Sequence, residues 1–468
     1  MIKKLFGHSV IYGLAPQVSK VSGLFALPII TPHLTENDFG MWGIIIAYVG
    51  GLDALGSLGM NVVLSNSFIR MKHQHKWLWR QIYGFLLLWA LPFCLILGGV
   101  LWVILPDSIV HLKWTIILLI TLPKLLFGPT AVMGRYMYQL DLKPTPVAIR
   151  MAIFGILTVL LNIYTIAFLK LGFMGWVWTM AVIALLSNLS YFFPVNIKKK
   201  ITPIFNFKYQ TIKEAIKVSI PTIPHTYASF LLNSSDRIVM DRMAVSIDNL
   251  GIYSLSARFG SYFSSLTTAF NRAASPLMLR HYKNNEDNKA RDIIFAFQIV
   301  ILSCTFLYSI WSKEIFQILI KNETLNKTYA LSIILVMAYN YRPMYVGAMN
   351  KLFYVEKTNL LWRVSFIAGA ANVVLNIIFI RLYGYEAAAY TTFGCLMYMG
   401  FSGFFIKKIN ESINVNFYPL FWFLVILGLT FSSTVAVELN ISKKLMISAL
   451  FLFVSSLTMW KIMNRAND

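Results

Sequence analysis

Residues 82–105 read IYGFLLLWALPFCLILGGVLWVIL, a stretch without a single charged side chain. About 20 apolar residues are enough for an α-helix to cross a lipid bilayer. The whole chain of 468 residues is 57% hydrophobic and 13% charged, whereas a soluble protein carries about 25% charged residues. This composition predicts an all-α integral membrane protein, and the apolar pattern predicts about 14 transmembrane helices.

The predicted spans follow one another along nearly the whole chain. Their expected limits are 9–34, 40–66, 82–105, 110–134, 146–169, 172–195, 212–240, 250–277, 292–312, 329–352, 359–382, 385–406, 417–437 and 444–463.

Basic residues recur in every second loop, and the alternate loops carry about as many acids as bases. Basic loops face the cytoplasm, so this bias predicts a multi-pass membrane protein with both termini in the cytoplasm. The net charge of +22 is spread over these short loops and forms no single basic domain. A nucleic-acid partner is therefore not expected.

A weak repeat divides the chain into two similar parts. Residues 36–43 (ENDFGMWG) resemble residues 247–254 (IDNLGIYS), and 159–163 (VLLNI) resemble 373–377 (VVLNI). The offset of about 211–214 residues spans six helices, which predicts two lobes in parallel orientation, an arrangement known in transporters. The expected domains are an N-terminal six-helix lobe (1–195), a basic cytoplasmic loop (196–213), a C-terminal six-helix lobe (214–408) and two additional helices (409–468).

Several charges fall inside the apolar stretches. They are Lys20, Asp53, Lys124, Arg150, Asp236, Arg237, Arg258, Arg272, Arg342 and Arg363. Each would cost about 2.5–3.5 kcal/mol if it faced lipid near the bilayer centre, so most are expected to face a wet or paired interior. Arg150 and Arg363 lie near span ends and can reach the interface. Because bases predominate, the interior should suit an anionic cargo.

Span 250–277 carries the clearest local pattern. Polar residues recur at spacings of three and four on one helical face, namely Ser254, Arg258, Ser261, Ser265, Thr268 and Arg272. Serine and threonine also line dry seams between membrane helices. An arginine in such a seam needs a partner, which favours a face that lines a cavity.

Asp53 and Asp236 are the carboxylates that lie well inside spans. Each could couple transport to H⁺ or Na⁺, or could form a structural ion pair, for which Arg237 is the neighbour of Asp236. No other cofactor is expected. The sequence shows neither a metal-binding spacing nor a catalytic motif, so an enzyme is not expected.

The chain resembles the polysaccharide exporters, or lipid-linked oligosaccharide (O-antigen type) flippases, of the multidrug/oligosaccharidyl-lipid/polysaccharide superfamily. The resemblance rests on Phe39-Gly40 with Trp42, Ser235-Asp236-Arg237 and Gly251-Ile252-Tyr253, together with the two-lobe layout. It implies a V-shaped bundle like that of the MATE transporters. It also implies transfer of an undecaprenyl-diphosphate-linked oligosaccharide by alternating access, for surface polysaccharide such as lipopolysaccharide O-antigen or capsule.

In such proteins a cationic cavity receives the diphosphate and sugar, a role that the resemblance assigns to Lys20, Lys124, Arg258, Arg272 and Arg342. Ser254, Ser261, Ser265 and Thr268 would form its polar face. Membrane lipids, a polysaccharide polymerase and a chain-length regulator would be partners.

Three alternatives stay open at this point. The two additional helices also resemble those of the peptidoglycan-precursor flippase, where they help form a lipid groove. A multidrug antiporter for organic cations would need acidic residues in its cavity, whereas eight of the ten charges inside spans are basic. A membrane-embedded polymerase would need paired catalytic groups at one interface, and none is evident.

Overall fold

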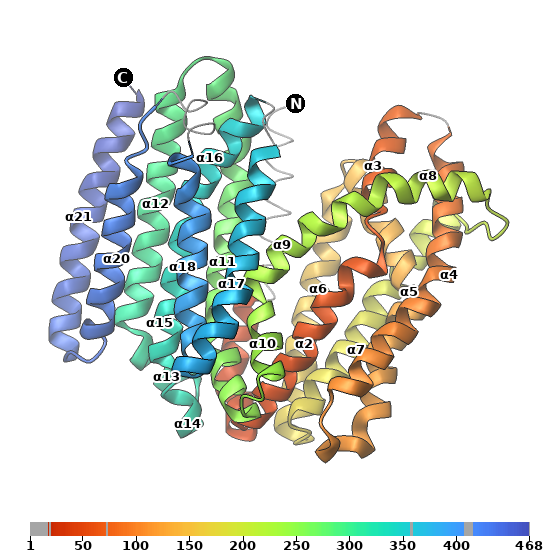
Figure 1. Cartoon of the computed structure of the whole chain (residues 1–468), viewed down its shortest axis with the longest axis horizontal. Coiled ribbons are helices and arrows are strands. Elements are labelled where there is room, and N and C mark those ends of the chain that lie inside the picture. Colours follow the sequence, from red (N-terminus) through yellow and green to blue (C-terminus); the bar gives the residue numbers. More distant parts are fainter. Residues whose placement is uncertain (1–16, 18–19, 72–73, 356–358, 407–414, 468) are drawn as a thin grey trace. The chain divides into compact units, whose positions relative to one another are not determined.

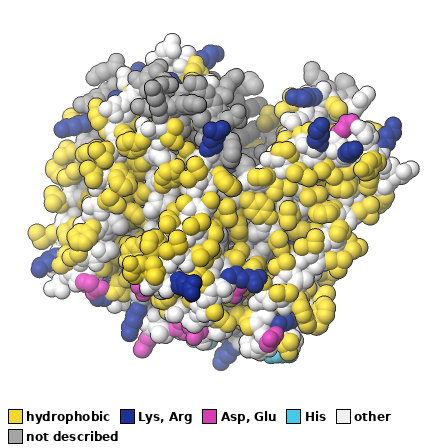
Figure 2. All heavy atoms as spheres, in the orientation of Figure 1, with side chains coloured by type: hydrophobic (Ala, Val, Ile, Leu, Met, Phe, Trp, Pro, Cys, Tyr) yellow, Lys and Arg dark blue, Asp and Glu magenta, His cyan; other side chains and the backbone are white. Residues whose placement is uncertain are grey.

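The computed structural model describes residues 17, 20–71, 74–355, 359–406 and 415–467, and these residues form helices and connecting loops without any strand. Within this part of the chain, nine helical segments are long and apolar enough to cross a membrane. Hydrophobic side chains cover the middle of the face shown in Figure 2, and charged side chains gather toward the two ends. The chain is therefore a multi-pass membrane protein.

The nine apolar helices coincide with nine predicted spans. Of the other five, 9–34 extends into residues outside the described part, and 250–277 lies in one long but more polar helix, α11 (Ile247–Lys283). Spans 212–240 and 329–352 are interrupted, and 385–406 is a short helix, α18 (Ala387–Phe401), continued by a 3₁₀ turn. The all-helical class is confirmed, and the number fourteen stays a prediction.

The described residues divide into two compact units. Unit 1 holds residues 1–34 and 41–230, and unit 2 holds residues 35–40 and 231–468. The main helices of unit 1 are α2 (Glu36–Gly56, whose first turn belongs to unit 2), α3 (Asn61–Arg70), α4 (His75–Ile104), α5 (Val110–Leu140), α6 (Pro144–Asn162), α7 (Phe173–Leu189), α8 (Tyr209–Ser219) and α9 (Ile223–Asn233).

In Figure 1, α4, α5, α6 and α7 run alongside one another within unit 1. The apolar helices α6 and α7 are extended by π-helical turns, at Ile163–Phe168 and Phe193–Lys198. The core of this unit includes Trp79, Leu86 and Met133, which are almost fully buried.

Unit 2 contains α10 (Ser235–Arg242), α11, α12 (Asp287–Ile310), α13 (Ser312–Leu319), α14 (Glu323–Asn326), α15 (Tyr329–Met337), α16 (Arg342–Tyr354), α17 (Asn359–Tyr383), α18, α20 (Pro419–Ala436) and α21 (Ile441–Asn467). Its core lies mainly among α11, α12, α15, α16 and α18, where Phe297, Met344 and Leu396 are buried. The predicted lobe boundaries stay a prediction: residues 196–230 pack with unit 1.

Two predicted spans are interrupted in their interiors. Residues 212–240 divide into α8, a 3₁₀ turn at Ile220–Thr222, α9 and α10. Pro221 lies in that turn and Pro224 follows it. Proline lacks the backbone N–H donor and disfavours a continuous helix, which explains the interruption at this place. Residues 329–352 divide at a 3₁₀ turn, Ala338–Tyr341, between α15 and α16. Neither interruption is visible in hydropathy alone.

The two additional helices, α20 and α21, belong to unit 2 and pack on α12 (Figure 1). Lys444 on α21 has a fully buried side chain and binds Glu314 at 2.6 Å, while Lys313 binds Glu438 at 2.5 Å. The hydrogen bond from Lys313 lowers the pKa of Glu438. Ion pairs at one end therefore fasten these helices to α13.

The two copies of the repeat meet at a pair of glycines. A Cβ on Gly251 would lie 1.9 Å from the carbonyl oxygen of Glu36, and one on Gly40 would lie 2.0 Å from that of Ile247. These distances are far below van der Waals contact, so only glycine permits the backbones of α2 and α11 to approach this closely. The repeated glycine thus marks a helix crossing within unit 2.

We expect Gly251→Ala to destabilise the protein by about 2–3 kcal/mol, the upper part of the range for overpacking, because the clash is with backbone. Thermal unfolding in detergent micelles would measure the change. Gly99→Ala in α4 is the matched control, since a Cβ there meets nothing within 4 Å. It should stabilise the helix by up to about 1 kcal/mol. Equal stability of the two variants would contradict the crossing.

Candidate functional site

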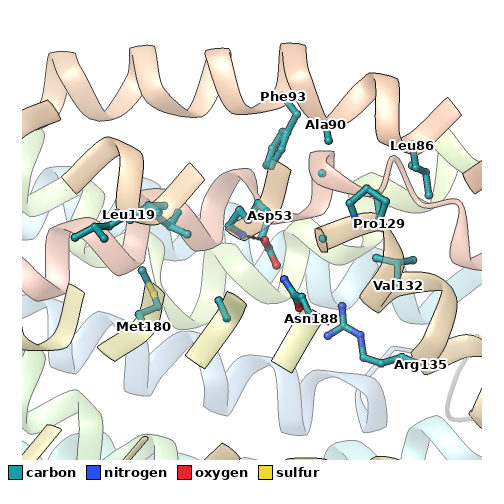
Figure 3. A pocket seen from close by; sticks show the side chains of 17 residues that line it. Asp53, Leu86, Ala90, Phe93, Leu119, Pro129, Val132, Arg135, Met180 and Asn188 are labelled. Atoms are coloured by element: carbon teal, nitrogen blue, oxygen red, sulfur yellow. Dashed lines mark hydrogen bonds and ion pairs between the residues drawn. The ribbon is translucent and has the colours of Figure 1, made fainter. Parts of the chain in front are cut away.

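A polar cavity of about 330 Å³ opens within unit 1, among α2, α4, α5 and α7 (Figure 3). Its polar and charged lining residues are Asp53, Ser57, Lys124, Arg135 and Asn188. In Figure 3, Asp53 and Asn188 point toward one another and Arg135 lies beside Asn188. Apolar side chains such as Phe93 and Leu119 complete the wall. The cavity holds two cations and one carboxylate, a net positive charge.

Asp53 and Lys124 form an ion pair in this cavity. Their side chains meet at 2.5 Å and are 65% and 27% exposed, respectively. Ion pairs with that much exposure contribute little net stability, typically about 0–1 kcal/mol. An incoming anion can therefore compete with Asp53 for Lys124 at small cost. The sequence left Asp53 between ion coupling and ion pairing, and the structure shows the pair.

Arg135 is a cavity residue that sequence reasoning placed in a loop. It lies near the C-terminal end of α5, is exposed, and has no hydrogen bond or ion pair with the rest of the described chain. The signal was present, because Lys124, Gly128, Val132 and Arg135 are spaced by four, four and three residues and all line the cavity. That spacing puts them on one face of a helix.

Two other predicted charges have different surroundings. Arg150 binds the hydroxyl and carbonyl oxygens of Ser190 and lies over the ring of Tyr191, so it joins α6 to the end of α7. This role is structural, in agreement with its exclusion from the expected site. Lys20, which the resemblance assigns to the cavity, is half-buried.

The predicted polar stripe on α11 is present. Ser261, Ser265 and Thr268 donate to carbonyl oxygens of their own helix, at 2.7, 3.0 and 2.8 Å. Arg258 is half-buried and Arg272 is exposed. Hydroxyls satisfied within their own helix cost little in an apolar medium, and their oxygens can still accept a hydrogen bond.

Asp236 lies in a buried polar cluster that joins four helices. Its side chain is 3% exposed, accepts a hydrogen bond from the Tyr253 hydroxyl and lies 3.9 Å from the Arg237 guanidinium. On the adjoining helices α17 and α18, the Thr392 hydroxyl lies 3.4 Å from the side-chain oxygen of Asn372. The cluster therefore contains an ion pair and several additional oxygen atoms.

Sequence reasoning missed the members of this cluster that come from α17 and α18. Asn372 and Asn376 are fully buried, and Thr391 donates to Asn376. The amide nitrogen of Asn376 is buried without a hydrogen-bond partner among the described residues. Two asparagines four residues apart on one face of an apolar helix were the available signal.

Arg342 lies at the interruption between α15 and α16. Its Nη1 is 2.9 Å from the Tyr341 hydroxyl, and its guanidinium carbon lies 5.9 and 5.8 Å from the ring centres of Tyr341 and Tyr345. Its Nε–H is buried, and in the described part of the chain it has no hydrogen-bond partner. No carboxylate there forms an ion pair with Arg342, so this cation retains capacity for an anion.

The family profile described as "Polysaccharide biosynthesis protein" matches residues 8–282, more than half of the chain. The chain belongs to this family. No curated protein matches it by sequence.

Solved structures share the fold of this family member over nearly its whole length. The lipid II flippase MurJ in an inward closed conformation has a TM-score of 0.73 at 15% identity, covering 97% of this chain and 99% of that one. An inward-facing multidrug resistance MATE transporter has a TM-score of 0.57 at 13% identity, and the match covers 86% of this chain and 95% of that one. A transporter of the MOP superfamily from Pyrococcus furiosus, described as having a binding pocket of reverse polarity, has a TM-score of 0.58 at 12% identity. The match covers 92% of this chain and 96% of that one.

The two intramembrane carboxylates of this family member should differ sharply in their contribution to stability. Asp53→Asn should change the free energy of unfolding by less than about 1 kcal/mol, because its ion pair is wet. Asp236→Ala should cost about 3–5 kcal/mol, because it leaves a buried arginine and a tyrosine hydroxyl without their acceptor. Thermal unfolding of both purified variants tests this, and similar losses would contradict the assignment of Asp236 to a dry cluster.

Arg342 should be dispensable for stability. Arg342→Met removes a half-buried cation that has no carboxylate partner, so we expect unchanged or slightly raised stability, within about 1 kcal/mol. Arg342→Lys keeps the charge and is the matched control. A large loss of thermal stability in Arg342→Met, but not in Arg342→Lys, would show that the positive charge beside the tyrosine rings holds the fold together.

Proposed function

We propose that this chain exports an anionic, undecaprenyl-diphosphate-linked oligosaccharide across the bacterial inner membrane by alternating access, with both termini in the cytoplasm. The product would serve a surface polysaccharide such as O-antigen or capsule, beside a polymerase and a chain-length regulator. Membership of the polysaccharide biosynthesis family supports the pathway. MurJ, which shares the fold, is a flippase for a lipid-linked precursor.

The observation that carries the proposal is an excess of intramembrane cations over carboxylates in both units. Lys124 and Arg135 share a cavity with one carboxylate, and Arg342 has no ion-pair partner in the described chain. Two negative charges on a diphosphate bind best to such donors, and arginine binds phosphate with two parallel hydrogen bonds. A transporter of organic cations would need the opposite balance.

In this proposal Lys124 exchanges one anion for another. The diphosphate takes the place of the Asp53 carboxylate on the Lys124 ammonium, while Arg135 offers a second donor to the same cavity. Tyr339, Tyr341 and Tyr345 surround Arg342 with aromatic faces and hydroxyls that suit a sugar. Lys20, Arg258 and Arg272, with the α11 hydroxyls, would extend the polar path for the oligosaccharide.

We assign the coupling of transport to a Na⁺ or H⁺ gradient to the Asp236 cluster rather than to Asp53. A carboxylate that is almost fully buried must bind a cation or a proton, or stay paired. The Tyr253 hydroxyl donates to Asp236, and the oxygens of Asn372 and Thr392 lie on α17 and α18, of which α17 packs on α10. Entry of Na⁺ or H⁺ would compete with Arg237 for Asp236 and alter how α10, α11, α17 and α18 pack. Asp53 would act only as the resting partner of Lys124.

The test is a flipping assay in proteoliposomes with a fluorescent undecaprenyl-diphosphate oligosaccharide. Lys124→Ala and Arg342→Met should each reduce the rate about 10- to 100-fold, the loss expected for one charge-assisted hydrogen bond. Lys124→Arg and Arg342→Lys are the charge-conserving controls. Asp236→Asn should abolish the response of the rate to imposed Na⁺ and H⁺ gradients, whereas Asp53→Asn should keep it.

Three outcomes would overturn one or more of these assignments. Uptake of a fluorescent organic cation, with no movement of the glycolipid by well-folded protein, would replace the exporter with a cation antiporter. A normal gradient response in Asp236→Asn, together with its loss in Asp53→Asn, would move coupling to the unit 1 cavity. Movement of a peptidoglycan precursor in preference to the oligosaccharide would change the substrate while keeping the mechanism.

A further inference from the structure

The segment between α7 and α9 forms a surface that the transport proposal does not use. It consists of residues 201–208, called here the strap, and the helix α8. Among its large residues, Phe205 is 58% and Tyr209 76% exposed. Exposed aromatic side chains are unusual in a polar linker between two units. They indicate that this surface contacts something apolar.

The strap is held firmly on the first turns of α4. The Arg80 guanidinium donates to the Thr202 carbonyl oxygen at 2.9 Å, and the Ile204 amide donates to the Arg80 carbonyl oxygen at 3.0 Å. A Cβ at Gly84 would lie 2.0 Å from the carbonyl oxygen of Ile204. The strap therefore has one defined position on α4, and its exposed face is defined as well.

Helix α8 continues this surface. It packs on α3 and α4 through Ile212 and Ala215, which are buried. In Figure 1 it runs across the ends of α3 and α4 rather than alongside them. With 11 residues it is only about 16 Å long, too short to span a bilayer. It has the form of an interfacial amphipathic helix.

The position of α4 sets the depth of this surface. α4 has 30 residues, which is about 45 Å and matches a bilayer with its headgroup regions. The strap contacts α4 between Arg80 and Gly84, about 8–14 Å from its first residue. These contacts lie where the charged first turns of α4, with Lys76 and Arg80, give way to the uncharged stretch 82–105, so the strap and α8 lie at the boundary between the headgroups and the hydrocarbon core.

The outward face of this surface is basic and aromatic. Lys208, Lys213 and Lys217 are exposed, and so are Lys76 and Trp77 on the adjoining start of α4. The Lys208 ammonium lies 5.9 Å from the ring centre of Trp77. Figure 2 shows basic side chains gathered over this part of unit 1. Glu214 is the one acidic residue on α8, and it is bonded to Gln210.

We propose that the strap and α8 bind the anionic phospholipid headgroups of the leaflet beside them. Each lysine near a membrane surface raises the affinity for anionic lipid about fivefold. Tryptophan and tyrosine favour the same headgroup depth. Charge complementarity and depth both favour lipid over a protein partner. This surface would make the packing of unit 1 depend on the anionic lipid content of the membrane.

The experiment compares wild type with Lys208→Gln/Lys213→Gln/Lys217→Gln, both purified in a neutral detergent. Addition of phosphatidylglycerol should raise the Tm of wild type more than the same amount of phosphatidylcholine does. The triple variant should lose more than half of this difference while keeping its Tm in detergent alone. Lys170→Gln/Lys321→Gln/Lys443→Gln removes the same charge from exposed positions elsewhere and should behave as wild type.

A spin label at Tyr209→Cys, in a Cys304→Ser background and in phosphatidylglycerol proteoliposomes, gives an independent readout of depth. We expect the label at the phosphate level, and a fully aqueous label would overturn the proposal. Stabilisation by soluble glycerol phosphate equal to that by the lipid would replace a membrane surface with a free-anion site. An unchanged lipid response in the triple variant, or binding of α8 to another protein instead, would also overturn it.

Discussion

The high cost of an unpaired charge in a membrane is the constraint on which the rest of this structure depends. Several charges near the ends of spans meet that cost by pairing. Lys351 binds Asp287 at 2.8 Å, and the fully buried side chain of Lys444 binds Glu314. Such pairs link helices that are distant in sequence, so the same energetic rule that limits charges also joins α12 to α16 and α13 to α21.

The charges that do not follow this rule are those to which the proposed function assigns the anionic cargo. Lys124 has its partner Asp53 in a wet cavity where the pair is weak, and Arg342 has tyrosines in place of a carboxylate. Each arrangement leaves a cation able to bind an additional anion. In the proposed function that anion is the diphosphate of the cargo. Asp236 is the opposite case, a carboxylate that is dry, hydrogen-bonded and close to its cation. Differences in hydration separate these roles more clearly than differences in residue type.

Sequence reasoning found these charges but not their neighbours. Periodicity identified the α11 stripe, because residues on one helical face are determined by local geometry alone. It could not join Asp53 to Lys124, which are 71 positions apart. It also missed Arg135, because hydropathy placed the end of the span before it, and the four residues Asn372, Asn376, Thr391 and Thr392, because uncharged polar groups are common in membrane helices.

The sequence by itself determined the class of the protein, its helical content, the excess of cations within the spans and the repeat. These properties follow from composition and from short-range periodicity. Apolar segments in a bilayer must satisfy their backbone hydrogen bonds internally, so long apolar stretches become helices. Tertiary structure alone decided which carboxylate is wet and which is dry, that Gly40 and Gly251 form one crossing, and that residues 201–219 are a docked surface and not a free linker. Those outcomes depend on contacts between distant segments, and their free energies appear only once the helices pack.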